Sequence, residues 1–353
     1  MKSLKIINIS SVLILAIIFI SLNSCSSDSD SGTEPKEVVL EDVNAFEQNE
    51  KLGAGVNLGS ALEAPTEGEW GVTLQTEFFQ LISEAGFSSI RVPIKWSAHT
   101  GENAPYTINK SFFDRIDWVI KTAFFYDLMV IINIHHFEEF MADPEGQHDK
   151  FISLWQQIGE HYKKYSHNLL FEVLNEPTDK VTNQKWNTYL ADAITVIRET
   201  NPGRTIVVGS GTWSSIYSIP ELVLPAGEDN VIVSFHYYNP FQFTHQGADW
   251  VDGANEWLGT EWKGSTNERI AIYDEFSIAW DYSVQNHVPI NVGEFGAFNR
   301  ADMASRVLWT NQIKSAAIDY GFSFHYWEFC AGFGIYNQSS KTWYDDLLKA
   351  LVP

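Results

Sequence analysis

From about residue 52 onward, short apolar runs rich in β-branched residues alternate with longer segments in which apolar residues recur at helical spacing. The runs are short enough to be buried strands, and they recur roughly every 35–45 residues. They predict eight strands, over residues 52–58, 89–93, 129–134, 169–174, 205–208, 231–235, 289–292 and 323–326. Strands that alternate with helices in this way form parallel sheets covered by those helices.

The segments between these runs predict amphipathic helices. Apolar residues share one face over residues 74–85, with Gly86 at the stop position, and similar faces occur over 151–162 and 186–197. Eight strand–helix units favour an α/β fold with a single closed (β/α)8 TIM barrel, and an open doubly wound sheet is the alternative. No glycine-rich phosphate loop follows the first strand, so the sequence indicates no nucleotide role.

The N-terminal segment has the order of a secretory signal. Lys2 and Lys5 precede an apolar run over residues 6–20 that is too short to span a bilayer comfortably. The next residues, Leu22-Asn23-Ser24-Cys25, resemble the lipobox of bacterial lipoproteins, although Asn23 departs from its commonest form. We therefore expect a signal peptide over residues 1–24 and lipidation of Cys25; the alternative is a plain signal peptide with Cys25 incidental.

A polar tract follows Cys25 and predicts a flexible tether over residues 25–40, before a barrel domain over 41–353. Residues 26–32 are similar to the acidic segment that sends some lipoproteins to the outer face of the outer membrane. The expected location is therefore the cell surface, through the lipid on Cys25, with a secreted or periplasmic protein as the alternative. Lipidation would leave Cys330 as the one remaining thiol, so no intramolecular disulfide is expected.

Composition narrows the range of partners. The chain has 45 acidic and 23 basic residues, a net charge of −22, and no run of Lys and Arg, so nucleic acid is not an expected partner. Hydrophobic content of 44% and charged content of 19% are typical of a globular chain and exclude intrinsic disorder.

Polar residues follow the predicted strands at the points where the strands end, which is where a parallel barrel builds its active site. Any one of them alone is typical of a solvated strand end, but one barrel mouth would collect them all. They are Arg91, His135, His136, Asn175, Glu176, His236, Tyr237, Tyr238, Glu294, Trp327 and Glu328.

Two carboxylates dominate this set. Glu176 follows strand four and Glu294 follows strand seven, so both should face the same mouth. Paired carboxylates of this kind match glycoside hydrolysis, in which a protonated acid serves the leaving oxygen and an ionised partner attacks the anomeric carbon. We expect Arg91 to keep Glu294 ionised, and a drier setting near His236, together with the negative charge of Glu294, to keep Glu176 protonated.

A metal site formed by His135, His136, Glu138 and Glu139 is the rival chemistry. Adjacent residues on an extended strand point to opposite sides, and the sequence has no His-Glu-x-x-His helix. We therefore expect neither a metal nor another cofactor.

The span from about residue 51 to 351 resembles glycoside hydrolase family 5 (cellulase family A), especially its bacterial endo-β-1,4-glucanases and glucomannanases. Seven strings carry the resemblance in order: Asn57-Leu58-Gly59, Arg91-Val92-Pro93-Ile94, Ile132-Asn133-Ile134-His135-His136, Leu174-Asn175-Glu176-Pro177, His236-Tyr237-Tyr238-Asn239-Pro240, Gly293-Glu294-Phe295-Gly296 and Tyr326-Trp327-Glu328-Phe329.

The resemblance implies a retaining endo-hydrolase in which Glu176 is the acid/base and Glu294 the nucleophile. It also implies that Asn175 binds the sugar 2-hydroxyl, and that Arg91 and Tyr238 orient Glu294. The remaining implied sugar contacts are a polar floor with His135, His136 and His236, a stacking platform at Trp327, and, from the loop after strand six, His245 and Trp250. For Trp250 the alternative is a side chain that only pins its loop.

One departure concerns Ser60, which stands where the relatives usually have Asn. The resemblance implies that Glu63 contacts distal sugar hydroxyls, whereas Ser60, shorter by an amide, would not reach. The balance between glucan and mannan depends on which polar groups are left unpaired.

The expected activity is hydrolysis of internal β-1,4 links in cellulose-type or mixed-linkage β-glucan, with glucomannan or mannan as a second substrate. The alternatives are a β-mannanase or xyloglucanase of the same family, or a non-catalytic surface glycan-binding lipoprotein. The presence of both Glu176 and Glu294 argues against the binder. We expect a monomer that touches the membrane through Cys25 alone.

Overall fold

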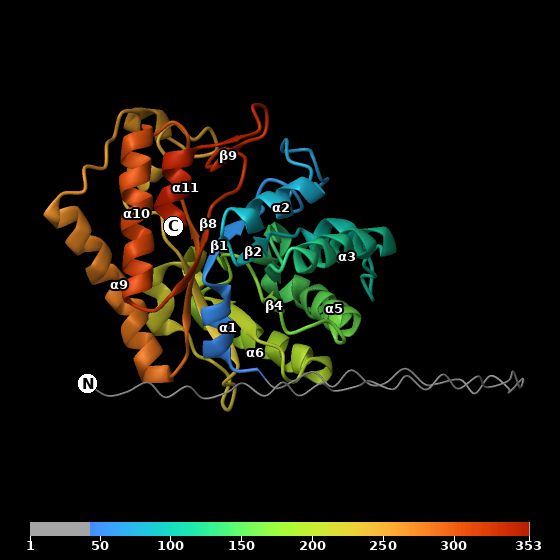
Figure 1. Cartoon of the computed structure of the whole chain (residues 1–353). Coiled ribbons are helices and arrows are strands. Elements are labelled where there is room, and N and C mark those ends of the chain that lie inside the picture. The colour runs from blue at the N-terminus through green and yellow to red at the C-terminus, as the bar shows by residue number, and fades with distance from the viewer. Residues whose placement is uncertain (1–42, 353) are drawn as a thin grey trace, which may run out of the picture. The chain divides into compact units, whose positions relative to one another are not determined.

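The computed structural model describes residues 43–352. Eight strands pair in sequence order, each parallel to the next, and β8 pairs with β1 to close the barrel (Figure 1). The predicted TIM barrel is confirmed, and the open-sheet alternative is wrong. The strands are β1 Ala54–Asn57, β2 Ser89–Val92, β3 Met129–Asn133, β4 Leu169–Glu172, β5 Ile206–Gly209, β6 Val231–His236, β7 Ile290–Phe295 and β8 Ser323–Tyr326.

Helices cover the outside of the barrel: α2 Thr76–Glu84, α3 Lys110–Phe125, α5 Pro144–Tyr162, α6 Asn183–Thr200, α9 Thr266–Asn286, α10 Met303–Asp319 and α11 Asp345–Leu351. Shorter elements lie in the connections: η1 Trp96–His99, α4 Glu138–Ala142, α7 Gly211–Ser214, η2 Ile216–Glu221, α8 Phe241–Thr244, η3 Ala254–Trp257, β9 Tyr336–Asn337 and β10 Thr342–Trp343. Within residues 43–352, no helix is both long enough and apolar enough to cross a bilayer.

The three helices expected from periodicity are present, and their ends have local causes. Gly86, with φ of 98°, follows α2, in keeping with its predicted role as a stop signal. The helix expected from residue 151 begins earlier, because Asp143 caps the backbone N–H of Gly146 and Pro144 occupies the first helical turn. Polar residues over 144–150 hide this first part of α5 from a search based on apolar spacing.

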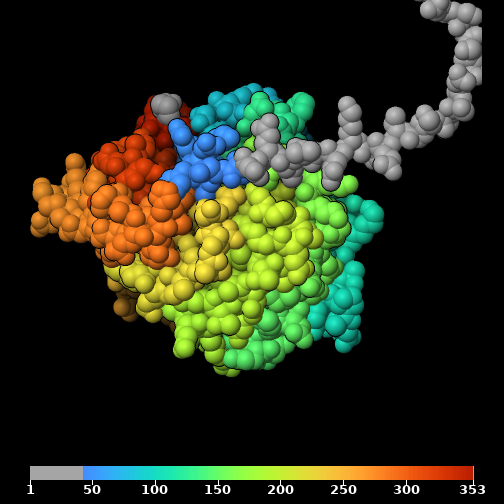
Figure 2. Space-filling view, turned by 90° about the horizontal axis from the view of Figure 1, so that it is seen from below, coloured from blue at the N-terminus to red at the C-terminus, as the bar shows by residue number. Residues whose placement is uncertain are grey.

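The first predicted strand is wrong at its start. Residues 45–52 form a helix, α1 Ala45–Leu52, that the sequence analysis missed, and Gly53 ends it with φ of 50°. Leu52 and Ala45 pack with apolar side chains of β3, β4, β5 and β6 in one cluster at the amino-terminal end of the barrel. Seen from below, α1 lies in the face opposite the strand ends that form the mouth (Figure 2). This helix therefore closes the bottom of the barrel.

The signal peptide over residues 1–24, the tether over 25–40 and the lipidated Cys25 lie outside the described residues. Cys330 is a buried free thiol. Burial raises its pKa above the usual range, so it is a poor nucleophile.

Replacement of Leu52 by alanine tests the role of α1. The side chain is fully buried, so Leu52→Ala should lower the free energy of unfolding by about 2–5 kcal/mol. Chemical denaturation would measure the loss, and Glu50→Ala, an exposed position on the same helix, is the matched control. Equal stability of the two variants would show that α1 does not seal the barrel.

Candidate active site

Arg91 lies at the centre of the polar interior of the barrel. Its guanidinium is fully buried and contacts Glu172 with two hydrogen bonds, of 2.5 and 2.6 Å. The remaining N–H groups donate to Asn57 at 2.8 Å, Glu294 at 2.7 Å and Asn175 at 2.8 Å. All five guanidinium donors are therefore used. Burial would lower the pKa of Arg91, but the charges of Glu172 and Glu294 raise it, so the group stays cationic.

The sequence analysis missed Glu172, the bidentate partner of Arg91. This residue is the last in β4, and its side chain is 3% exposed. The prediction of one apolar strand over 169–174 passes over the acidic residue within it. A carboxylate inside a buried strand is rarely found without a paired charge, so it was itself a signal.

Three polar side chains surround the carboxylate of Glu294. Besides Arg91, the hydroxyl of Tyr238 donates to Glu294 Oε2 at 2.9 Å, and His236 Nδ1 lies 3.5 Å from the same oxygen. Burial raises the pKa of Glu294 above its usual value and Glu176 adds to the rise, while the charge of Arg91 and the Tyr238 hydrogen bond oppose it only in part. The carboxylate is 6% exposed, so these neighbours take the place of water around its ionised form.

Glu176 has a different setting. It follows β4 with φ of 45°, its side chain is 22% exposed, and Oε1 lies 2.7 Å from His236 Nδ1. Burial raises the pKa of Glu176 to about 7, Arg91 opposes the rise, and Glu172 adds to it. The dry setting expected from the sequence is thus present. Glu172 is a second negative neighbour, besides the expected Glu294, and the repulsion between Glu176 and Glu294 also raises the pKa of Glu294.

The two carboxylates come close together. One oxygen each of Glu176 and Glu294, and one ring nitrogen of His236, lie within 4.8 Å of one another. Such a trio has the donor types of a metal site, and burial, which lowers the pKa of His236 to about 4, keeps its ring neutral as in a metal ligand. The guanidinium of Arg91, which already pairs with Glu294, disfavours a second cation there. The arrangement suits an acid and a nucleophile that share one substrate.

The two adjacent histidines do not point to opposite sides as expected, so that argument against a metal site was wrong. His136 has φ of 49°, which is not extended backbone, and the rings of His135 and His136 lie 4.6 Å apart. His135 is buried, and its pKa is well below the usual range because of that burial. Asn133 donates to His135 Nδ1 at 3.1 Å, so Nε2 carries the proton and can donate to a hydroxyl.

Trp327, the expected sugar-stacking residue, also lies at the mouth of the barrel, beside His135. The indole of Trp327 lies parallel to the His135 ring, with an interplanar angle of 8° and centroids 6.1 Å apart. Deeper in the barrel, His325 lies between Ser89 and Asn291 at 3.0 and 3.2 Å, and burial lowers its pKa to about 3. The strand ends thus surround the carboxylates with neutral rings.

His245 and Trp250, from the loop after β6, line the same hollow as Glu176. His245 is buried, stacks on Phe241 at 4.0 Å, and has its pKa lowered to about 4 by burial. Trp250 packs edge-on against Phe298 at 4.9 Å but remains 58% exposed. A side chain that served only to pin its loop would bury more of its surface.

Glu63 lies folded back on its own loop. Its side chain is buried, and its two oxygens accept from the backbone N–H groups of Ser60 and, at 3.0 Å, Ala61. Burial raises the pKa of Glu63 to about 7. A second acid that the sequence analysis did not assign, Glu328, accepts from the N–H groups of Ala331 and Phe333, and burial raises its pKa to about 8. Glu63 thus fixes its own turn, and its sugar contact stays a prediction.

A family model described as Cellulase (glycosyl hydrolase family 5) matches residues 50–332, most of the barrel. The chain belongs to glycosyl hydrolase family 5. The resemblance seen in the seven strings is confirmed.

Relatives of this family 5 chain are named endoglucanases or cellulases. It is 34% identical to Endoglucanase H of Acetivibrio thermocellus and 28% identical to Cellulase/esterase CelE of the same organism, over 88% and 91% of its own length. It spans only 34% and 42% of those two relatives. Structures of Thermotoga maritima Cel5A with mannotriose and with cellobiose are 47% identical, with a TM-score of 0.86, and match 88% of this chain and 100% of theirs.

The family 5 mouth has a further aromatic residue that the sequence analysis did not single out. Trp213 is 61% exposed and borders a hollow of about 580 Å³ that also includes Glu176 and Trp250. It lies in α7, where Thr212, Trp213 and Ser214 have φ of 52°, 63° and 51°. Each non-glycine residue with positive φ lowers the stability of the fold by about 1–3 kcal/mol, so contacts with the rest of the fold must hold this turn in place. The sequence gives no signal for this, because no glycine occupies those three positions.

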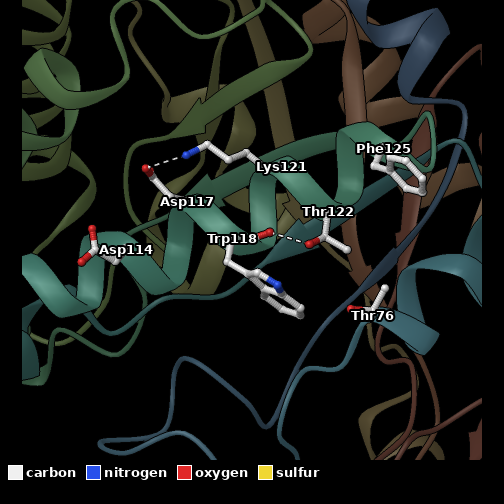
Figure 3. A pocket seen from close by; sticks show the side chains of 7 residues that line it. All are labelled: Thr76, Asp114, Asp117, Trp118, Lys121, Thr122 and Phe125. Atoms are coloured by element: carbon white, nitrogen blue, oxygen red, sulfur yellow. Dashed lines mark hydrogen bonds and ion pairs between the residues drawn. The ribbon is translucent and has the colours of Figure 1, made fainter.

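A separate hollow of about 460 Å³ lies along α3, on the outer layer of the family 5 barrel (Figure 3). Trp118 and Phe125 line it, and Lys121 donates to Asp117 at 3.1 Å beside it. Since helix surfaces rather than strand ends form this hollow, it holds none of the residues predicted for the reaction.

The electrostatic role of Glu172 gives the first test of the site in this family 5 protein. Glu172→Gln removes a negative charge that raises the pKa of Glu176, so the alkaline limb of the pH profile of kcat/KM should move to lower pH. Breaking the buried pair with Arg91 should also cost roughly 3–5 kcal/mol of stability.

Initial rates between pH 5 and 9 on a soluble substrate would measure the limb, and thermal unfolding would measure the stability. Glu139→Gln, an exposed acid beyond β3, is the matched control. An alkaline limb that stays in place or rises in Glu172→Gln would contradict this electrostatic assignment.

Proposed function

We propose that the protein is a retaining endo-β-1,4-glucanase that cuts internal links of cellulose-type or mixed-linkage β-glucan. The observation that carries this proposal is the pair Glu176 and Glu294, whose oxygens approach within 4.8 Å in different electrostatic settings. Inversion needs about 6.5–9.5 Å between the two carboxyl groups, so that a water fits between attacker and sugar, whereas retention uses about 5–5.5 Å.

In the first step, Glu294 attacks the anomeric carbon while Glu176 gives its proton to the leaving oxygen. The bond to the leaving sugar breaks, a glycosyl ester forms on Glu294, and the released chain leaves as an alcohol. Since the pKa of Glu176 is about 7, a large share of this group is protonated at neutral pH, as an acid needs to be. Arg91 and Tyr238 hold the other carboxylate in line for attack.

In the second step, Glu176 acts as the base. Esterification removes the negative charge of Glu294, so the repulsion between the two close carboxylates disappears and the pKa of Glu176 falls. The ionised Glu176 then takes a proton from water, which attacks the same carbon and releases the sugar with its original configuration. The proton that Glu176 gives to the leaving oxygen in the first step is regained from water in the second, so the full cycle balances and the free enzyme is restored.

Sugar binding would use both sides of the mouth. Asn175 accepts from Arg91 through its carbonyl oxygen, which leaves its NH2 group to donate to the 2-hydroxyl at the cleaved sugar. On one side Trp327 offers an indole face, and on the other the exposed Trp213 does the same. The cellobiose complex of the Thermotoga maritima relative supports a β-glucan substrate, and its mannotriose complex supports glucomannan or mannan as a second one.

The reaction itself tests the proposal. Incubation with soluble β-glucan should release reducing ends, and an NMR time course should show β-configured sugar as the first product. Glu176→Gln should lower kcat about 10²–10⁴-fold, and Glu294→Gln by at least as much, with the fold intact by circular dichroism.

Azide separates the two roles. In Glu294→Ala, azide should occupy the vacated space and yield a glycosyl azide of inverted configuration from an aryl β-cellobioside. The same product from Glu176→Ala would mean that the roles are exchanged. A first product of α configuration from the parent enzyme would overturn the retaining mechanism altogether.

We further propose that residues 1–24 are removed and that a lipid on Cys25 attaches a monomer to the outer membrane, facing outward. The support is the order of the segment: two lysines, an apolar run, a lipobox-like tetrapeptide and a polar tract. Surface attachment would give the enzyme direct access to a polymer too large to enter the cell.

Fractionation of cells tests the anchor. Cys25→Ala should move the enzyme from the membrane fraction to the soluble fraction with kcat unchanged, because the barrel does not need the lipid. Protease treatment of whole cells, with a periplasmic marker as control, should degrade the parent protein if it faces outward. An unchanged distribution of Cys25→Ala would show that the anchor assignment is wrong.

A further inference from the structure

Glu275 lies in the middle of α9, in the outer layer of helices, and its carboxylate joins three segments of the chain. The hydroxyl of Tyr217, in η2, donates to Glu275 Oε1 at 2.6 Å. Glu275 Oε2 accepts from the hydroxyl of Tyr237 at 2.5 Å and from the side-chain amide of Asn239 at 3.1 Å, both in the connection after β6. Hydrogen bonds to a charged acceptor are the strong ones, so this carboxylate fixes η2 and the connection after β6 to α9.

The residues on either side of Tyr237 contact the catalytic carboxylates. His236 Nδ1 lies 2.7 Å from Glu176 Oε1, and the hydroxyl of Tyr238 donates to Glu294 Oε2 at 2.9 Å. Both side chains therefore point into the mouth. A donor that moves away by about 1 Å no longer forms such a bond, so both contacts depend on where the backbone of this segment lies.

The side chain of Tyr237 points the opposite way, into the outer layer. It is buried, and its ring centroid lies 5.1 Å from that of Phe276 in α9 and 6.4 Å from that of Trp309 in α10, two helices that lie side by side (Figure 1). Successive side chains of an extended chain point to opposite sides. An anchor on Tyr237 therefore holds the backbone that carries its two neighbours into the mouth.

The sheet alone does not fix this segment. The register between β6 and β7 shifts between Phe235 and His236, and β6 ends at His236. Past the end of the strand, the backbone N–H of Tyr237 donates to the carbonyl of Glu294 at 2.8 Å. The side-chain bonds to Glu275 thus act where the regular pairing of the strands stops.

We propose that Glu275 is a positioning residue for the nucleophile. Its carboxylate holds Tyr237 from the outer layer, and through that residue it keeps the hydroxyl of Tyr238 in contact with Glu294. The hydrogen-bond partners of Glu275 among the described residues are two phenols and an amide, so it acts on the reaction through them. This inference rests on the proposed function, in which Glu294 attacks the anomeric carbon.

The positioning role predicts a direction for the pH profile. Burial raises the pKa of Glu294, and the Tyr238 hydrogen bond is one of the contacts that lower it. A displaced Tyr238 therefore raises this pKa further and moves the acidic limb of kcat/KM to higher pH. Loss of the negative charge of Glu275 would by itself act in the opposite direction, because removal of a negative neighbour lowers the pKa of an acid.

The other titratable groups keep their places in this comparison. Those that face the nucleophile are Arg91 of β2, Glu176 after β4, His236 and Tyr238 at the end of β6, and Glu63 after β1. Those that contact Glu275 are the phenols of Tyr217 and Tyr237. Burial and the contact with Glu275 raise the pKa of both phenols, that of Tyr217 to about 12, so both remain donors in the pH range of an assay.

Substitution of Glu275 tests the inference. In Glu275→Ala, the acidic limb on soluble β-glucan should rise by about 0.5–1 pH unit, because complete loss of a hydrogen bond to a charged group would move it by roughly 1–2 units. The kcat at pH 7 should fall roughly tenfold, less than the about 100-fold that a 1 Å misplacement can cost. Glu275→Gln keeps the volume and one acceptor oxygen, so its limb should move less. Asp281→Ala, which removes an exposed acid of the same helix, is the matched control and should behave as the parent.

Tyr237→Phe identifies the route, and it keeps the packing of the outer layer. It removes the phenol hydroxyl alone and should move the acidic limb in the same direction. In that background Glu275→Ala should add little, because residues that act through one another are not additive. Additive shifts, a limb that moves to lower pH in both Glu275 variants, or a loss of thermal stability with the limb in place would each overturn the positioning role while the catalytic assignment stands. A parent enzyme that releases no reducing ends from β-glucan would instead overturn the proposed function, and this inference with it.

Discussion

The buried cation of Arg91 is the interaction on which the rest of the mouth depends. A guanidinium removed from water is very costly unless it is fully paired, and here it meets two carboxylates and two side-chain amides. Because its donors lie in one rigid plane, the positions of Glu172, Glu294 and Asn175 are fixed relative to one another. A lysine would keep the charge but not this geometry.

The same contact ties together strands that are distant in the chain. Asn57, which accepts from Arg91, donates in turn to the carbonyl of Gly293 at 3.0 Å and so joins β1 to β7. Gly293 itself has no room for a side chain, since a Cβ atom there would lie 2.5 Å from Ser234 Oγ and 3.2 Å from the ring of His236. The nucleophile follows directly after this glycine. Its position is thus set by backbone packing on one side and by the cation on the other.

Much of this architecture could be predicted, and the exceptions have physical causes. Eight apolar runs with helical segments between them indicate a barrel, because buried strands and the helices that cover them must alternate along the chain. In such a barrel all strands end at one mouth, so the topology alone brings Glu176 and Glu294 together. A search for apolar runs does not register a single polar side chain inside a strand. It therefore does not find Glu172. The turn at Trp213 and the orientation of His136 depend on positive φ at residues other than glycine, which tertiary contacts impose and local sequence does not reveal. The sequence pattern does not predict helix α1, because the helix is short and mostly polar and only its packing under the barrel stabilises it.

The buried titratable groups also shape how stability responds to acid and base. Three buried histidines have lowered pKa values in the folded protein, of about 4 for His236, 4 for His245 and 3 for His325. Below about pH 6.5 the unfolded chain therefore binds more protons than the folded protein, and stability falls as the pH falls. Three buried acids act in the opposite direction: the pKa values of Glu63, Glu176 and Glu328 are about 7, 7 and 8. The folded state therefore keeps their protons to higher pH than the unfolded chain does, and stability is lost as the pH rises above about 4.5. Between these limits the three histidines and the three acids offset one another. The barrel thus has a built-in plateau of stability in mildly acidic solution, produced by the same desolvation that prepares its mouth for chemistry.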